Sequence, residues 1–166
     1  MREELEQKLI EKYPQIFNRP PHRTETSGHY VYPCVGDGWY DLLDTLCDTI
    51  QKAIDRRSRS IDCGFTDPSE AIPQVIASQI KEKFGGLRFY FIGGNELTRG
   101  AIELAESMSY RICEQCGKPG SPREEGWIQT LCDEHAAKRQ HDSKNNRIVL
   151  AETVAAPVVT QGDANA

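Results

Sequence analysis

Hydrophobic residues recur at helical spacing in three segments of the chain, and each segment predicts an amphipathic helix. Residues 2–13 form the first, which Pro14 ends because proline cannot continue a helix. Residues 39–56 form the second, with an apolar stripe of Trp39, Leu42, Leu43, Leu46, Cys47, Ile50 and Ile54. Asn95 can cap the third helix, over residues 96–110. We expect its core stripe to consist of Leu97, Ala101, Leu104, Ala105 and Met108.

An alternating pattern predicts a β-hairpin between the second and third helices. Residues 87–92 place apolar side chains on one side and Arg88 and Tyr90 on the other, as in a half-buried strand. The preceding residues 74–82 have a spacing that suits either a strand or a helix. Because a strand needs a partner, we favour a hairpin of about 74–82 with 87–92, turning at Gly85–Gly86.

Polar stretches separate these elements. Residues 18–28 and 61–73 have the composition of loops, and His29–Tyr32 suits a short strand that Pro33 ends. Asp55–Ser60 has the composition of a charged exit from the second helix. The tail, residues 143–166, contains valines and a leucine that suit one more strand, and we expect poor order beyond about residue 156.

Two pairs of metal-binding residues lie in the C-terminal third of the chain. Cys113 and Cys116 form one pair, Cys132 and His135 form the other, and two residues separate the members of each pair. Fifteen residues lie between the pairs, which fits one tetrahedral Cys₃His zinc site. Gly117 follows the second thiolate, where a knuckle often needs a positive φ. Four protein ligands leave no open position for water, so we expect one structural Zn²⁺ and no catalysis at this metal.

The residues around the ligands predict the local fold. A strand within Gly126–Thr130 suits a short hairpin after the first cysteine pair, and residues 133–140 suit a helix. Knuckle, hairpin and helix together describe a treble-clef-like subdomain.

Composition narrows the function. The chain has 166 residues and a net charge of −5, which disfavours broad binding to phosphate backbones because that requires clustered lysine and arginine. The sequence contains no apolar run of 18 residues, and its charged beginning lacks the apolar core of a signal peptide. We therefore expect a cytoplasmic protein without a membrane partner, whose cysteines are metal ligands or reduced thiols.

Two surfaces are candidates for contact with a partner. Asp41, Asp44 and Asp48 recur on the polar side of the second helix, either as a docking row for a basic partner or as a solvated face. Arg88 and Tyr90 on the predicted strand can stack or contact phosphate, or simply cover the sheet. The zinc segment itself carries balanced charges and so lacks the basic footprint of a nucleic-acid-binding module.

The other candidate chemistry is weaker. Cys47 lies on an apolar stripe and suits the core, whereas His29, Cys34 and Cys63 have irregular spacing for a second metal site. A treble-clef nuclease would need a histidine in the hairpin, and residues 117–131 contain none. No glycine-rich phosphate loop opens a helix.

The segment Lys81–Tyr90, together with the CxxCGKPG knuckle from Cys113, Gly126–Trp127 and the Thr130–His135 run, resembles a family of small uncharacterised proteins of tailed bacteriophages and prophages. The resemblance covers roughly residues 29–140 and is most specific over 81–135. It implies a bacterial cytoplasmic protein of phage origin with zinc at the four ligand positions. It implies no particular activity.

These observations together predict an α+β protein with three parts. Residues 1–110 form a mixed helix and sheet body, 111–142 a zinc-binding subdomain, and 143–166 a partly disordered tail. We expect a non-enzymatic interaction protein that binds a host protein, such as a defence or transcription factor. The alternatives are a nucleic-acid-binding zinc regulator and a metal-dependent hydrolase or nuclease. The sequence leaves the oligomeric state open.

Overall fold

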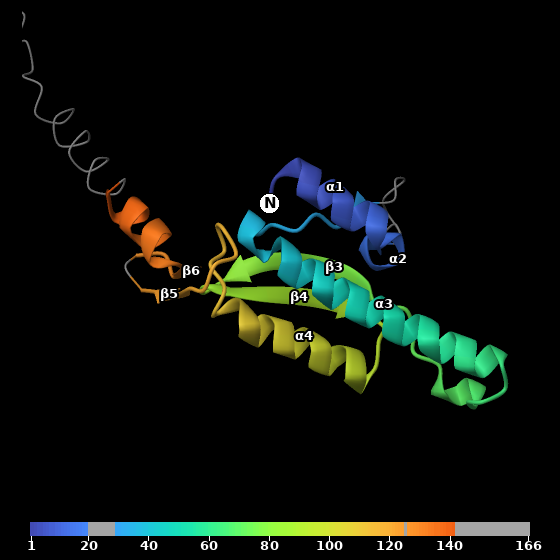
Figure 1. Ribbon diagram of the computed structural model, residues 1–166. Helices are drawn as coiled ribbons and strands as arrows, with labels where there is room; N and C mark the ends of the chain where they lie inside the picture. Colours follow the sequence, from blue (N-terminus) through green and yellow to red (C-terminus); the bar gives the residue numbers. More distant parts are fainter. Residues whose placement is uncertain (20–28, 125, 142–166) are drawn as a thin grey trace, which may run out of the picture. The chain divides into compact units, whose positions relative to one another are not determined.

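The computed structural model describes residues 1–19, 29–124 and 126–141 (Figure 1). The tail strand expected after residue 142 therefore lies outside the described residues. The chain divides into two compact units, Met1–Cys132 and the residues from Asp133 onward. Residues 133–141 form one helix in the second unit, as the sequence predicted.

The first unit contains helices and small antiparallel sheets, which confirms the α+β class. The helical elements are α1 (Glu3–Lys12), α2 (Pro14–Phe17), η1 (Asp37–Trp39), α3 (Tyr40–Asp62), η2 (Pro68–Glu70) and α4 (Glu96–Ser109). The strands are β1 (Asn18–Arg19), β2 (His29–Tyr30), β3 (Ile76–Lys83), β4 (Gly86–Ile92), β5 (Ser121–Arg123) and β6 (Gln129–Leu131). They pair as β1–β2, β3–β4 and β5–β6.

The β3–β4 hairpin is confirmed, and its pairing contains one irregularity. The pairing shifts by one residue between Ala77 and Gln79, so a bulge lies in β3. Ala77 and Ile80 are consequently both buried although three positions separate them. The buried positions of β3 therefore do not alternate strictly. Phe84 and Gly85 make the turn with φ values of 54° and 76°.

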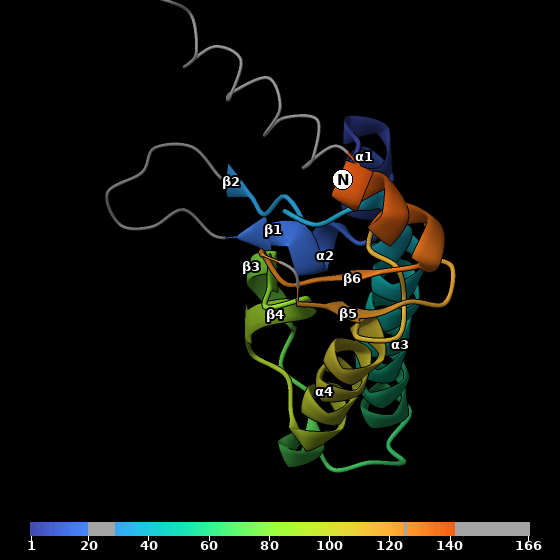
Figure 2. The same ribbon diagram turned by 90° about the vertical axis from the view of Figure 1, so that its left-hand side faces the viewer.

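One continuous core fills the space between the hairpin and the helices. α3 and α4 lie on the same side of β3–β4 (Figure 2), and the largest fully buried side chains include Trp39, Phe17 and Leu43. Residues just before α3 extend the sheet, because Cys34 forms a parallel bridge with Lys81. The body thus brings the start of α3 beside the hairpin.

α3 is longer than the sequence predicted. Asp55–Ser60 was expected as a charged exit, but these residues continue the helix, which ends only at Asp62. No glycine or proline interrupts the chain until Gly64, whose φ of 76° then ends the helical turn. Ion pairs support the charged section, since Arg57 Nη1 lies 2.5 Å from Glu70 Oε2.

The predicted core stripe of α4 is confirmed for Ala105, which is buried, and for Ala101, which packs partly buried against the core, but it is wrong for its other three residues. Leu97, Leu104 and Met108 are 59%, 62% and 45% exposed. The buried residues of the helix are Thr98, Ile102, Ala105 and Ser109. A row that includes polar side chains faces inward because the outer edge of β4 has no strand partner among the described residues, and its N–H groups need acceptors. Ser109 Oγ accepts from Leu87 N–H at 2.8 Å, and Glu106 Oε1 accepts from Phe89 N–H at 2.8 Å.

Candidate metal centre

The four predicted ligands come together. The ligand atoms of Cys113, Cys116, Cys132 and His135 all lie within 4.8 Å of one another. Cys116 Sγ and Cys132 Sγ are 3.8 Å apart, and every cysteine among the described residues is a free thiol. A tetrahedral ion with metal–sulfur bonds of about 2.3 Å requires a sulfur–sulfur separation of about 3.8 Å. The cluster therefore has the composition and spacing to hold one metal ion.

Backbone hydrogen bonds shape the first ligand pair into a knuckle. Gly117 N–H donates to Cys113 O at 2.8 Å, and Cys113 N–H donates to Lys118 O at 2.8 Å. Gly117 has a φ of 76°, as the sequence predicted, and this conformation lets the chain reverse immediately after Cys116. These hydrogen bonds of the knuckle thus join residues that lie close together in the sequence.

The local electrostatics suit a cation. Burial acts to raise the pKa of Cys113, but backbone N–H groups of Cys132, Cys116 and Gln115 oppose it, so this pKa lies below its ordinary value. For Cys116, the Lys118 N–H lowers the pKa, but burial and the neighbouring thiols outweigh it and leave the pKa raised. Neighbouring thiolates repel one another, so ionising one thiol disfavours ionising the next. A bound cation offsets this repulsion and stabilises the thiolates.

The segment Gly36–Trp39 holds the knuckle against the body. Gly38 N–H donates to Glu114 O at 2.8 Å, and Trp39 Nε1 donates to Ile112 O at 2.9 Å. A Cβ at Gly38 would lie under 3.0 Å from backbone atoms of the knuckle, including Cys116 N at 2.6 Å. Only glycine permits this approach. The sequence predicts a helix from Trp39, but nothing in a single sequence indicates that the residues before it hold the knuckle.

The hairpin that carries Cys132 is attached to the turn of β3–β4. Thr130 O accepts from Glu114 N–H at 2.9 Å, which joins the hairpin to the knuckle. Thr130 Oγ1 donates to Gly85 O at 2.6 Å, and Trp127 Nε1 donates to Glu82 Oε2 at 3.0 Å. Three of the four ligands thus lie on segments bonded directly to the core of the first unit.

Glu114 is a buried acid within the knuckle. Its residue is 6% exposed, and Oε1 accepts from Gly36 N–H at 3.0 Å. Among the described residues, Oε2 has no hydrogen-bond partner. Burial raises the pKa of this carboxyl, the Gly36 N–H lowers it, and the negative charge of Glu82 raises it further, so the net direction is upward. The knuckle therefore contains an acid that burial disfavours in its charged form.

The acidic row on α3 is partly used within the protein. Asp44 forms an ion pair with Lys12 of α1 at 2.8 Å and accepts a hydrogen bond from the Tyr13 hydroxyl at 2.9 Å. Asp48 pairs with Lys52 at 2.8 Å, whereas Asp41 is exposed. Docking of a basic partner on this row stays a prediction, and Asp44 already holds two helices together.

Arg88, Tyr90 and Asp37 lie outside the metal cluster. Arg88 Nη2 donates to the Tyr110 hydroxyl at 2.8 Å, and Tyr90 is 43% exposed on the hairpin. Asp37 lies in the first turn of η1, directly before α3, and its carboxylate accepts from Arg2 N–H at 2.7 Å and forms an ion pair with the Arg2 side chain at 2.5 Å. The structure thus gives Asp37 a tertiary contact rather than a capping bond.

The three cysteines outside the cluster have separate environments. Cys47 is buried in α3, and burial raises the pKa of its thiol far above the ordinary value. Cys34 and Cys63 are exposed, one beside β3 and the other directly after α3. Within the described part of the chain, the only metal-binding cluster is the one that includes Cys113.

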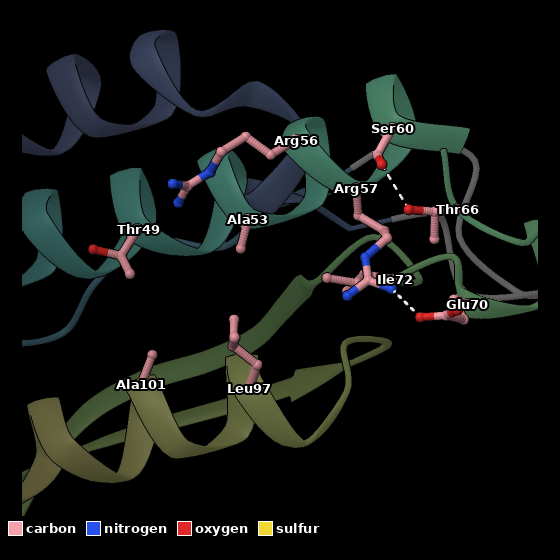
Figure 3. Close-up of a pocket in the computed structure, with 10 residues that line it drawn as sticks. All are labelled: Thr49, Ala53, Arg56, Arg57, Ser60, Thr66, Glu70, Ile72, Leu97 and Ala101. Atoms are coloured by element: carbon pink, nitrogen blue, oxygen red, sulfur yellow. Dashed lines mark hydrogen bonds and ion pairs between the residues drawn. The ribbon is translucent and has the colours of Figure 1, made fainter. Parts of the chain in front are cut away.

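A hollow lies between α3 and α4. It has a volume of about 660 Å³, and its apolar lining includes Ala53 on α3, Ile72, and Leu97 and Ala101 on α4 (Figure 3). Arg56 and Arg57 line the same groove from α3. The sequence does not predict this groove, because the helical spacing of Leu97 places it equally well in the core.

No described helix is long and apolar enough to span a membrane. No family model matches the chain, and neither the curated proteins nor the solved structures contain a match. The function must therefore be argued from the metal centre and the surfaces of this fold.

Proposed function

We propose that this protein is a non-enzymatic interaction module, stabilised by one structural Zn²⁺, that binds a helix of a partner protein. Three thiols and an imidazole favour zinc among the metals common in cells, and the 3.8 Å sulfur separation suits its tetrahedral geometry. Four protein ligands leave no position for a reacting water, which supports a structural role.

The order of elements supports a treble-clef-like arrangement around the metal. A knuckle with two ligands, the β5–β6 hairpin, and the helix 133–141 that begins directly after the third ligand follow one another along the chain. Because the knuckle and hairpin are bonded to Gly38 and Gly85, the metal would stabilise the body as well as its own segment.

The exposed apolar stripe of α4 carries the proposal of a partner protein. Leu97, Leu104 and Met108 lie at intervals of seven and four residues, so they share one face of the helix. The partly buried Ala101 lies among them and reaches the α3–α4 groove together with Leu97. A contiguous apolar face beside a groove is typical of a surface that accepts an amphipathic helix.

The charges beside the groove indicate which residues the partner helix should carry. Arg57 is paired with Glu70, but Arg56 makes no ion pair with any described residue and donates only to Lys52 O at 3.0 Å. A partner helix in this groove that carries an acidic residue beside its apolar face could form an ion pair with Arg56. We propose an amphipathic helix of that chemistry, and the resemblance to phage proteins makes a protein of the bacterial host its expected source.

The test compares variants that change only the exposed stripe. The tagged protein captures candidates from host lysate, and each candidate is purified before its affinity is measured by calorimetry. We expect Leu97→Gln/Leu104→Gln to lower the affinity for a specific partner roughly 30-fold or more. Covering each half-exposed leucine contributes about 1–2 kcal/mol, and about 1.4 kcal/mol is tenfold in affinity.

Matched variants separate this binding from other outcomes. Glu103→Gln lies on the exposed surface of α4 outside the apolar stripe and should leave the affinity unchanged. Arg56→Gln should weaken binding and reduce its salt dependence. The proposal fails if the leucine variant and Glu103→Gln bind equally well. It also fails if sedimentation shows that the stripe instead pairs two copies of this chain.

A further inference from the structure

The outer face of the β3–β4 hairpin is a second surface, and it carries basic and aromatic side chains. Residues on β4 alternate between the two faces of the hairpin, with Leu87 and Phe89 buried in the core and Arg88 and Tyr90 on the opposite face. The register places Lys81 opposite Arg88, so these cross-strand partners share that outer face.

Cations and aromatic rings lie against one another there. Lys81 Nζ lies 5.4 Å from the centre of the Tyr90 ring, and the Arg88 guanidinium lies 5.8 Å from the Tyr110 ring. Tyr110 reaches this face because Gly86 has no side chain. A Cβ there would meet the ring, including Cε2 at 2.8 Å. We call Lys81, Lys83, Arg88, Tyr90 and Tyr110 the basic–aromatic face.

The charge of this face is opposite to that of the whole chain. The protein has a net charge of −5, yet the face contributes three cations and no carboxylate. Lys81, Lys83 and Arg88 form no ion pair with any residue that the structure describes. Glu82, between the two lysines, is directed away and accepts hydrogen bonds from Gly85 N–H and Trp127. The two lysines can therefore meet an external anion, and Arg88, which donates to Leu87 O and the Tyr110 hydroxyl, adds its positive charge beside them.

We propose that the basic–aromatic face binds single-stranded nucleic acid. Lys81, Lys83 and Arg88 would contact successive phosphates, and a base would stack on the exposed Tyr90 ring. Duplex nucleic acid keeps its bases stacked internally and offers no free base to this ring, so the aromatic component favours a single strand. This surface is separate from the α4 stripe, so the inference does not depend on the proposed partner helix.

The experiment measures fluorescence anisotropy of labelled oligo-U and oligo-dT of about 12 nucleotides with the full, metal-loaded protein. Three phosphate contacts predict a slope of about −2 for the logarithm of affinity against the logarithm of salt. Lys81→Gln/Lys83→Gln should reduce that slope to about −0.7. The control Lys8→Gln/Lys52→Gln removes the same charge from α1 and α3 and should leave the slope unchanged.

The stacking component has its own test. Tyr90→Ala should weaken binding at least fivefold, whereas Tyr90→Phe keeps the ring and should bind like wild type. Leu97→Gln/Leu104→Gln should also bind the oligonucleotide normally, which distinguishes this face from the α4 stripe. The inference is overturned if no binding occurs at about 25 mM salt, or if the control lysine variant loses as much affinity. It is also overturned if inorganic polyphosphate competes equally and Tyr90→Ala has no effect.

Discussion

Replacing Gly38 by alanine tests whether the metal knuckle is built into the core. The added Cβ would approach Cys113 O, Gly117 N and Cys116 N, all closer than 3.0 Å. These are backbone atoms of the ligand-bearing loop, so no flexible side chain can move aside. The substitution must therefore displace the knuckle, the segment before α3, or both.

Two contributions set the size of the effect. Overpacking a well-packed site costs about 1–3 kcal/mol. Moving the knuckle also breaks the 2.8 Å bond from Gly38 N–H to Glu114 O, and an unsatisfied buried polar group costs about 1–3 kcal/mol. The sum is about 2–6 kcal/mol. For a chain of this length, that corresponds to a fall in Tm of roughly 5–20 °C.

The assay combines thermal unfolding with metal content per chain. Gly100→Ala is the matched control, because Gly100 lies in exposed α4 and its added Cβ would meet nothing within 4 Å. Alanine is the better helix former by about 0.5–1 kcal/mol, so this control should raise Tm by roughly 1–4 °C. We expect Gly38→Ala to lower Tm and to lose metal more readily to a chelator.

One result would refute the reasoning. If Gly38→Ala keeps one metal per chain and unfolds within about 2 °C of wild type, the predicted clash does not exist. The knuckle would then lie away from Gly38, and its metal would stabilise only its own segment.

Three further predictions use the same protein. Cys116→Ser should abolish stoichiometric zinc binding and accelerate amide exchange in β5–β6, and retention of one zinc per chain by mass spectrometry would contradict the assigned ligands. Native alkylation should modify the exposed Cys34 and Cys63 but not Cys47, whose burial and raised pKa keep the thiol protonated; peptide mapping would show the order. Glu114→Gln removes a carboxyl with a raised pKa. The folded state therefore binds a proton more tightly than the unfolded state does, and wild type loses stability as pH rises through that pKa. The variant should gain Tm over wild type as pH increases, and a constant difference across pH would count against a buried charge.

Local sequence determined the metal site and most elements. The two ligand pairs and Gly117 specify a knuckle through short-range spacing, and the structure brings the same four residues within 4.8 Å of one another. The alternation from Leu87 to Ile92 likewise predicted β4, because a strand with one buried face must repeat every second residue. These features depend on neighbours along the chain, so the sequence alone revealed them.

Tertiary contacts decided which face of each element is buried. On α4, leucines lie outside while Ser109 lies inside, because its hydroxyl accepts from Leu87 N–H on the free edge of β4. Thr98 also lies inside, where it closes the capping box with Asn95. Asp44 looked like a solvated residue and proved to be a contact with α1. The spacing of apolar residues along α4 shows that they share one face of the helix. It does not show whether that face packs in the core or lies on the surface, because this depends on how the helix packs against β4.

The role of Gly38 illustrates the same division. A single sequence shows a glycine before a helix, which has many local explanations. Only the fold brings the backbone from Cys113 to Gly117 against it, more than seventy residues later in the chain. The sequence therefore determined that four residues can hold a metal, through their chemistry and spacing. The tertiary structure decided that the knuckle is part of the core, because close packing of two backbones leaves no room for a side chain.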